Sequence, residues 1–411
     1  MGVVTDVRRV RQLPPVYLLG PAFVAAIAYV DPGNVAANVS AGSQYGFLLL
    51  WVIVLANLMA SLVQYLSAKL GLVTGMSLPE AVAAHTRTPT RIAYWLQAEL
   101  VAMATDLAEV VGGAIALYLL FDLPLLLGGV ITGAVSLLLL TVQNRRGQRT
   151  FEYVITGLLM VIALGFLSSL FVDPPSPGQV VSGLLPRFDG AESVLLATAM
   201  LGATVMPHAV YLHSGLARDR HGHPEAGAPR RRLLIVTRWD VATAMLLAGA
   251  VNIAMLLVAA THLQGRQDTD SIEGAYHAVQ DSLGPNIALL FAIGLLASGL
   301  ASTSVGAYAG AMIMEGLLKI SVPLLWRRLV TLIPALVILG IGFDPSRALV
   351  LSQVVLSFGI PFALIPLIRL TSKPELMGTD INHRVTSMLG WIAAAVITVL
   401  NVVLIYLTVT G

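Results

Sequence analysis

Between Gln12 and Ala68 the chain carries one charged residue, Asp31. Apolar segments of ~20 residues are the length that spans a bilayer as a helix, and the rest of the sequence continues this pattern. Of its 411 residues, 57% are hydrophobic and only 11% are charged, and the mean hydropathy is +0.83. These values lie outside the range of soluble globular domains. The sequence therefore predicts an all-α integral membrane protein.

Eleven segments are long and apolar enough to cross a membrane, and the loops between them are too short to fold as separate domains. The predicted spans are 16–45, 48–72, 92–120, 123–142, 153–172, 193–216, 234–260, 287–318, 322–343, 348–371 and 388–409. We thus predict a single transmembrane transporter domain over residues 1–411.

The basic residues predict the orientation of these spans, because Lys and Arg collect on the cytoplasmic side. With the N-terminus inside, eleven spans leave only Arg187, Arg266 and Arg347 in outward loops. We therefore expect a cytoplasmic N-terminus and an outward C-terminus, with the first span retained rather than cleaved as a signal. The absence of cysteine excludes disulfides and thiolate metal sites.

Two spans are interrupted by helix-breaking residues. Asp31-Pro32-Gly33-Asn34 lies inside the first span and Met206-Pro207-His208 inside the sixth. Breaks in spans one and six of eleven are typical of two inverted five-helix repeats, which bind substrate where the broken helices meet. The predicted repeats are 16–172 and 193–371, with 388–409 as an accessory helix. The alternative is that these prolines only kink their helices.

The chemistry of the two breaks favours a cation. An unwound helix supplies backbone carbonyls, Asp31 adds a negative charge, and Asn34 offers an amide oxygen. Met206 adds a thioether, a soft donor that Ca²⁺ and Mg²⁺ do not prefer. This mixed set predicts a borderline transition metal such as Mn²⁺ or Fe²⁺. The alternative for Met206 is simple packing.

Two histidines follow in the sixth span. His208 adjoins the proline and His213 lies five residues further on. Imidazole titrates near neutral pH, so each could carry protons or bind metal. A histidine bonded to a neighbouring carbonyl is the other interpretation, and for His213 the sequence does not separate them.

The third span carries an acidic stripe. Glu99, Asp106 and Glu109 are spaced to share one helical face, which we expect to point into the protein. Arg327 and Arg328, at the start of the ninth span, are their expected partners. These acids and arginines together predict a proton route. The alternative is a static network of ion pairs.

Taken together, these motifs identify a resemblance. The chain resembles the Nramp family, natural resistance-associated macrophage proteins, whose bacterial members are proton-coupled manganese importers. Asp31 to Asn34 is similar to the family's first-helix DPGN motif, and Met206 to His208 to its sixth-helix MPH motif. The resemblance extends along nearly the whole chain, including the third-helix acids and the arginine pair.

The resemblance implies a LeuT-like fold and a set of site residues. Asp31, Asn34 and Met206 would bind metal, joined by the backbone carbonyls of Ala28 and Ala203 and by Gln353. His208, Asp106 and Glu109 would belong to a proton-linked network, with Arg327 and Arg328 as partners.

We therefore expect a secondary transporter that imports Mn²⁺, and also Fe²⁺ and Cd²⁺, with proton coupling by alternating access. A bacterial plasma membrane is the expected location. The expected partners are metal ions, protons and the lipid bilayer, with no cofactor, no nucleic acid and no obligate protein partner. The alternatives are a cation-coupled amino-acid carrier of the same fold and, more remotely, a membrane enzyme.

Overall fold

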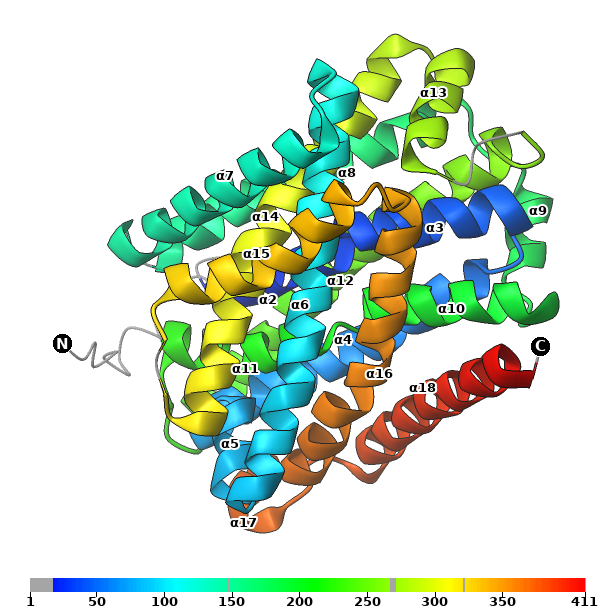
Figure 1. Ribbon diagram of the computed structural model, residues 1–411. Coiled ribbons are helices and arrows are strands. Elements are labelled where there is room, and N and C mark those ends of the chain that lie inside the picture. The colour runs from blue at the N-terminus through cyan, green and yellow to red at the C-terminus, as the bar shows by residue number, and fades with distance from the viewer. Residues whose placement is uncertain (1–17, 147, 267–270, 321, 411) are drawn as a thin grey trace.

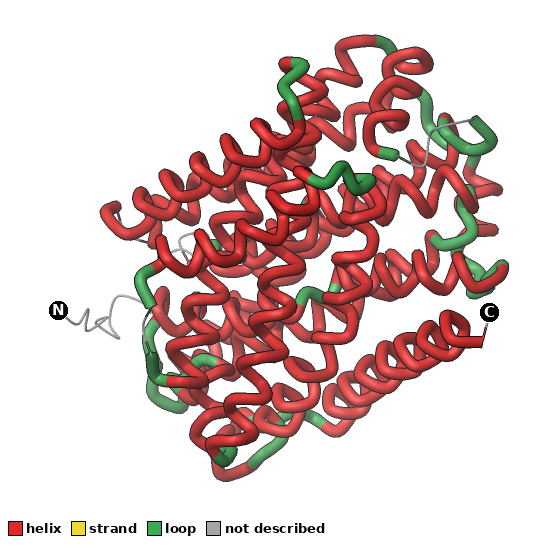
Figure 2. The backbone as a smooth tube through the Cα atoms, viewed as in Figure 1, coloured by secondary structure: helices red, strands yellow, loops and turns green. Residues whose placement is uncertain are grey.

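The computed structural model describes residues 18–146, 148–266, 271–320 and 322–410, and these are helical apart from short connections (Figures 1 and 2). No strand occurs in these ranges. The helices are α2 (Pro21–Ile27), η2 (Ala28–Val30), α3 (Pro32–Tyr45), α4 (Leu50–Thr74), α5 (Leu78–Ala84), α6 (Thr88–Phe121), α7 (Leu125–Arg146), α8 (Gln148–Val172), α9 (Pro177–Gly183), α10 (Gly190–Thr204), α11 (Pro207–His221), α12 (Ala228–His262), α13 (Ile272–Leu283), α14 (Pro285–Leu318), α15 (Leu324–Gly340), α16 (Pro345–Thr371), α17 (Pro374–Met377), η3 (Gly378–Asp380) and α18 (Arg384–Thr410).

Each of the eleven predicted spans coincides with a helix or with a broken pair of helices. Within the described residues, eight elements are long and apolar enough to cross a membrane by themselves, counting α10 and α11 as one. Asp31 divides the first span into α2, η2 and α3, and α15 has 17 residues. The fourth span corresponds to α7, which has 22 residues. The start of the first predicted span and Arg8, Arg9 and Arg11 lie outside the described residues.

Four short helices were not predicted. They are α5, α9, α13 and α17, which lie in the connections between spans. Of these, α13 has 12 residues and occupies part of the long connection after the seventh span. Hydropathy did not reveal them because they are short or amphipathic rather than uniformly apolar.

The centre of the bundle is formed by the two broken helices and by α6, α14, α12 and α16. The most extensive contact is between α6 and α14, and α14 also packs along α8. Figure 1 shows α18 (red) beside α16 at the edge of the bundle. The lipid-facing surface is apolar, as exposed side chains such as Leu164, Phe171 and Leu246 illustrate. Spanning helices with buried polar centres are typical of transporters.

Candidate functional site

The first break begins where Asp31 leaves helical geometry. Asp31 has an extended backbone (φ −70°, ψ 169°) and is the N-cap of α3, with Pro32 at the first helical position. A residue before proline is disfavoured in the helical region, and a proline at this position loses no hydrogen bond. The Asp31 Oδ1 atom accepts hydrogen bonds from the backbone N of Asn34 at 2.7 Å and from its Nδ2 at 2.8 Å. The break thus holds the carboxylate in place at the start of a new helix.

The second break lies opposite, between α10 and α11. Val205 and Met206 are non-helical, and Pro207 starts α11. Asn34 joins the two breaks, because its Nδ2 also donates to the carbonyl of Ala203 at 2.9 Å. Asp31, Asn34, Ala203 and Met206 are each at most 1% exposed. The structure therefore brings the two motifs together in one buried site.

Several acceptors in this site have no hydrogen-bond donor. Oδ2 of Asp31, Oδ1 of Asn34 and Oε1 of Gln353 are all buried and unpartnered among the described residues. Buried polar atoms are nearly always paired, so three orphaned oxygens in adjacent helices indicate a place for a cation. No group of three or more His, Cys, Asp or Glu side chains that could hold a metal occurs in the described ranges. A metal site here would depend on amide, carbonyl and thioether donors beside one carboxylate.

Two helical segments, η2 and α10, end at the two breaks. Ala28 begins η2, three residues before Asp31, and Ala203 is the second-last residue of α10. Both are buried, and η2 contacts α10. The C-terminal end of a helix carries partial negative charge, which favours a cation. This arrangement supplies electrostatic stabilisation without a second carboxylate.

Gln353 reaches the site because two glycines make room for it. A Cβ atom added to Gly33 would lie 1.8 Å from Gln353 Nε2, and one added to Gly202 would lie 1.9 Å from its carbonyl oxygen. Only glycine permits such close contact between α3, α10 and α16. Gln353 is fully buried, and its Nε2 donates to Ser352 Oγ at 3.1 Å.

Two side chains from other helices donate hydrogen bonds to backbone carbonyls that the first break leaves without a helical partner. Asn252 Nδ2 on α12 donates to the Tyr29 carbonyl at 2.7 Å, and Ser298 Oγ on α14 donates to the Val30 carbonyl at 2.6 Å. Asn252 also accepts from Asn38 Nδ2 at 2.9 Å. Unwound backbone within a membrane needs partners of this kind.

Replacing Asn252 with alanine is expected to destabilise the protein by about 2 kcal/mol or more, because the Tyr29 carbonyl and Asn38 Nδ2 would both lose a buried partner. The measurement is the melting temperature of the purified protein in detergent. Thr243→Ala on the same helix is the control, since the Thr243 hydroxyl bonds only to carbonyls of its own helix. Equal melting temperatures for the two variants would contradict this role for Asn252.

The two histidines have different surroundings. His208 Nδ1 lies 3.4 Å from Thr105 Oγ1 on α6, which places it beside the acidic stripe. His213 Nδ1 donates to Gln64 Oε1 at 2.6 Å, and Gln64 Nε2 in turn donates to the Tyr29 hydroxyl. His213 Nε2 is buried without a hydrogen-bond partner among the described residues. His213 is therefore linked to the first break rather than to the acids.

The acidic stripe meets the arginine pair, as their placement in the sequence predicted. Arg328 NH1 forms an ion pair with Asp106, and Arg328 Nε donates to Ser136 Oγ at 3.2 Å. Arg327 NH2 lies 3.1 Å from Glu99 Oε2. A small cavity of about 10 Å³, lined by Asp106, Arg327 and Arg328, lies between them. This volume suits roughly one water molecule.

Glu109 has no arginine partner in the described part of the chain, unlike Asp106 and Glu99. We had expected the arginines to pair with all three acids. Glu109 is fully buried, and neither carboxylate oxygen has a hydrogen-bond partner in the described part of the chain. It lies within electrostatic range of Asp31, Asp106 and Arg328. Glu109 is thus the acid of the stripe that lies within electrostatic range of both the Asp31 carboxylate and the buried ion pair.

Asp106→Asn is expected to cost about 3–5 kcal/mol of stability, because it leaves the buried Arg328 guanidinium without its counter-charge. Glu99→Gln is the matched comparison, since the Glu99 side chain is 21% exposed and partly solvated. Its expected cost is at most about 1 kcal/mol. Thermal unfolding in detergent measures both, and a larger loss for Glu99→Gln would contradict this ranking.

At the other end of the first broken helix, α2 is held by an aspartate. Asp240 on α12 accepts from the backbone N atoms of Gly20 and Ala22, each at 3.0 Å. These are N–H groups that the start of a helix leaves unpaired. Arg220 and Glu152 form an ion pair nearby, at 3.4 Å.

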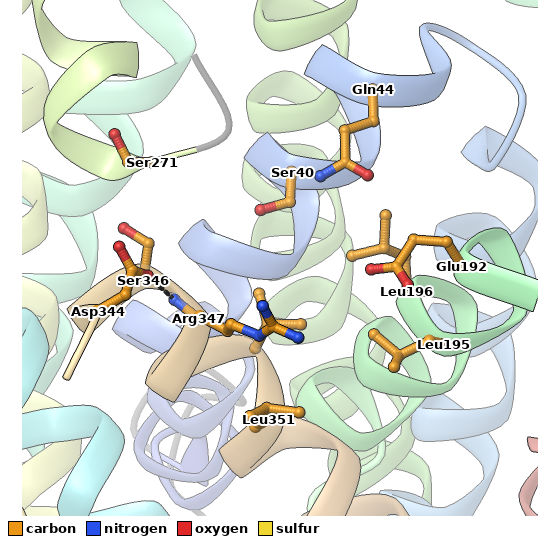
Figure 3. Close-up of a pocket in the computed structure, with 11 residues that line it drawn as sticks. Ser40, Gln44, Glu192, Leu195, Leu196, Ser271, Asp344, Ser346, Arg347 and Leu351 are labelled. Atoms are coloured by element: carbon orange, nitrogen blue, oxygen red, sulfur yellow. Dashed lines mark hydrogen bonds between the residues drawn. The ribbon is translucent and has the colours of Figure 1, made fainter. Parts of the chain in front are cut away.

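A wide cavity leads toward the site from one end of the bundle. Its volume is about 540 Å³, and α3, α10 and α16 form most of its wall (Figure 3). Val350 on α16 and Leu196 on α10 line this cavity, and they precede Gln353 and Ala203 by three and seven residues. At 1.5 Å per residue this is roughly 5 and 10 Å along each helix. The cavity is polar, with Glu192, Asp344 and Arg347 at its rim.

The motifs of the sequence did not predict the groups that support the two breaks. These are Tyr29, Gln64, Asn252, Ser298 and Asp240. The available signal was a lone polar side chain within an apolar span, because such residues in membranes are usually bonded inside the protein. The partner of each one lies far away in sequence and could not be deduced from spacing.

Comparison with known proteins agrees with this architecture. Residues 22–407 match the Nramp family model, described as natural resistance-associated macrophage protein-like. A Mycobacterium tuberculosis protein named divalent metal cation transporter MntH is 72% identical over 395 residues, covering 96% of this chain and 92% of the relative. A manganese transporter from Eremococcus coleocola has a similar structure, with a TM-score of 0.83 and 32% identity over 95% of this chain and 86% of that one.

A more distant structure extends the comparison of folds. Mhp1, a nucleobase-cation-symport-1 family transporter, aligns with a TM-score of 0.61 at 16% identity, covering 95% of this chain and 93% of that one. The likeness confirms the expected LeuT-like fold and carries no information on substrate. The family match spans nearly the whole chain, and the closely similar relative agrees with it. The chain belongs to the Nramp family.

Proposed function

We propose that this protein is a secondary transporter that imports divalent transition metal ions, with Mn²⁺ as the main substrate and Fe²⁺ and Cd²⁺ as further ones. The observation that carries the proposal is the set of unpartnered oxygens on Asp31, Asn34 and Gln353 where the two helix breaks meet. The names of the M. tuberculosis and E. coleocola proteins support the same substrate class. The family is one of transporters, not enzymes.

The metal ligands in this proposal are Asp31, Asn34, Met206 and Gln353, with the carbonyls of Ala28 and Ala203. In the structure the Asn34 amide nitrogen bridges Asp31 Oδ1 and the Ala203 carbonyl. A cation bound by these two oxygens would replace that N–H donor. Asn34 would then turn its Oδ1 toward the ion. Met206 is fully buried beside this position and contributes the soft sulfur donor.

An amino-acid carrier is disfavoured by the same atoms. A substrate carboxylate needs free N–H donors at a helix N-terminus. At the start of α3 the backbone N of Asn34 is already bonded to Asp31, and the unpartnered side-chain atoms of Asp31, Asn34 and Gln353 are acceptors. These side chains therefore favour a cation over an anionic group.

Proton coupling would use the groups that lead away from the metal site. We assign Asp31, His208, Glu109, Asp106 and Glu99 to the proton pathway, with Arg328 and Arg327 as counter-charges and His213 as a separate branch. The ion pairs and the small cavity between them support a continuous polar route through α6. Glu109 lies within electrostatic range of both Asp31 and Asp106, so its carboxylate is the expected carrier of the proton.

Glu109→Gln is expected to reduce proton movement, or its coupling to metal, at least about tenfold more than it reduces metal binding. The reason is that Gln keeps the shape of the side chain but carries no titratable proton, and the Glu109 carboxylate makes no hydrogen bond to the proposed metal ligands in the described structure. Lumenal acidification and metal affinity are measured on the same preparation. Equal losses in both would favour a static role for the acids.

Alternating access requires one open and one closed end. The cavity of about 540 Å³ offers the open end, and we assign the closed end to α2, held by Asp240, and to η2, held by the contact of Tyr29 with Gln64. From the distribution of Lys and Arg we assign the open end to the outside. The N-terminus is then cytoplasmic, the C-terminus outward, and the expected location is a bacterial plasma membrane.

The repeat boundaries are also part of the proposal: 16–172, 193–371 and the accessory helix 388–409. Helix contacts support them. After the first break α3 packs on α12, and after the sixth-span break α11 packs on α4. If spans one and two are equated with spans six and seven, the contact of α3 with α12 corresponds to the contact of α11 with α4. An inverted repeat requires such a correspondence.

The partners in this proposal are metal ions, protons and the bilayer, with no cofactor, no nucleic acid and no obligate protein partner. The test is uptake by purified protein in proteoliposomes. Mn²⁺, Fe²⁺, Ca²⁺, Mg²⁺ and an amino-acid mixture are offered in turn across a set pH gradient and voltage. Mn²⁺ entry with lumenal acidification is the expected result. Na⁺-dependent entry of an amino acid without metal entry would overturn the proposal.

A further inference from the structure

The largest of the cavities described here is lined by none of the proposed metal or proton residues. It has a volume of about 760 Å³ and is formed by the end of α4, the start of α12 and the segment around η3. This is the end of the bundle opposite the cavity above the metal site, where basic residues gather. Its lining combines charged side chains with the apolar side chains of Leu234, Ile235 and Ile381. The cavity is therefore amphipathic.

The charges of this cavity are predominantly positive. Lys69, Arg231 and Arg238 line it, and Asp380 is the acid among the described lining residues. Asp380 is already bonded, because Arg230 NH1 lies 3.2 Å from its Oδ2. The net positive charge that remains suits an anionic ligand with several acceptor oxygens.

Lys69 is an unusual residue for a cavity wall, because it is only 7% exposed. Its Nζ donates to Asn382 Oδ1 at 2.9 Å, and an ammonium group has three N–H donors. Its other two have no hydrogen-bond acceptor among the described residues. A buried lysine with free donors toward a polar cavity indicates a bound anion more strongly than a surface lysine would.

Arg238 is positioned by stacking. Its guanidinium lies 5.0 Å from the centre of the Tyr65 ring, and both residues line the cavity. Stacking of this kind holds the guanidinium plane while its N–H edge stays available for bidentate contact with a phosphate.

The face of α12 beside the cavity is exposed and becomes apolar with depth. Arg231, Ile235 and Arg238 are exposed and spaced to share one helical face, and the exposed face continues through Trp239 and Leu246. A tryptophan next to basic residues is typical of the headgroup level of a membrane. A ligand with an anionic head and an apolar tail would match both the basic cavity and the apolar face of α12. A soluble phosphate would contact the basic cavity alone.

We propose that this cavity binds the phosphate headgroup of an anionic phospholipid, whose acyl chains lie along the exposed face of α12. Basic pockets between helices at this level are typical of lipid headgroup sites. The site lies outside the proposed metal and proton residues. It therefore adds a lipid ligand to the proposed function.

The test uses Arg231→Gln and Arg238→Gln, singly and together, with Arg87→Gln/Lys319→Gln as the matched control. All four residues are exposed basic side chains, and Arg87 and Lys319 lie at the same end of the bundle outside this cavity. Native mass spectrometry counts phosphatidylglycerol and phosphatidylcholine retained by the purified full-length protein. We expect preferential retention of phosphatidylglycerol, weakened roughly fivefold by each single substitution and roughly twenty-five-fold by both.

Two results would overturn the proposal. One is retention of phosphatidylglycerol by the double variant at the level of the control. The other is displacement of phosphatidylglycerol from the unmodified protein by millimolar inorganic phosphate alone, which would assign the cavity to a soluble anion. The variant Arg231→Lys/Arg238→Lys retains both charges and checks folding, since it is expected to bind phosphatidylglycerol nearly as well as the unmodified protein.

Discussion

Asp31→Asn is expected to abolish Mn²⁺ uptake into proteoliposomes and to lower metal affinity by about a hundredfold or more. Asparagine has nearly the same shape, so the hydrogen bond from the Asn34 backbone N can persist. The negative charge is lost, however, and it is the one charge among the proposed ligands. Removing one partner of a buried pair of charges costs 2–5 kcal/mol or more. The variant should therefore fold but not bind.

The control for Asp31 is Asp344→Asn in the wall of the cavity that leads to the site. Asp344 caps α16 by accepting from the Arg347 backbone N, and it is exposed. This substitution is expected to leave uptake within about threefold of the unmodified protein, since an exposed charge outside the site contributes little to binding. Uptake by Asp31→Asn at the level of this control would remove Asp31 from the metal site.

Met206→Ala is expected to reduce the preference for Mn²⁺ and Cd²⁺ over Ca²⁺ by about tenfold or more. The thioether is the only soft donor in the proposed ligand set, and oxygen ligands alone suit Ca²⁺ well. The measurement is competition by Ca²⁺ and Mg²⁺ against Mn²⁺ uptake. Loss of affinity for all ions by the same factor would indicate that Met206 only packs.

Met200→Ala is the matched control for Met206. Met200 is fully buried in α10, before the break, and is not a proposed ligand. Both substitutions remove the same buried volume, so both are expected to destabilise the protein by about 2–5 kcal/mol. Selectivity is expected to change only for Met206, which separates a ligand role from a packing role.

The elements that the sequence predicted are those with a strong local signal. Long apolar segments predicted the eleven spans, and prolines next to polar residues predicted both breaks. The acids of α6 and the arginines of α15 were predicted to meet because charges inside a membrane need partners. The structure pairs Arg328 with Asp106 and Arg327 with Glu99, and among the residues it describes Glu109 has no ion-pair partner.

What could not be predicted depends on contacts across the fold. Asn252 bonds to a carbonyl 223 positions away, and Asp240 to a backbone N 220 positions away. Neither residue belongs to a motif or a periodic pattern. The approach of Gln353 to Gly33 and Gly202 also requires three helices in their final arrangement. The local sequence predicts each helix break, but it does not predict the side chains that form hydrogen bonds with the backbone groups freed there.

The way in which α2 is attached has a thermodynamic consequence. All seven of its residues are apolar, with Val24 and Ile27 fully buried, and its start is held by hydrogen bonds to the Asp240 carboxylate. Apolar exposure to water raises heat capacity, whereas polar exposure lowers it. Separation of α2 from the bundle into water is therefore expected to proceed with a positive change in heat capacity, because it uncovers Val24 and Ile27. Its equilibrium should consequently curve with temperature in the same sense as unfolding, on the smaller scale set by one short helix.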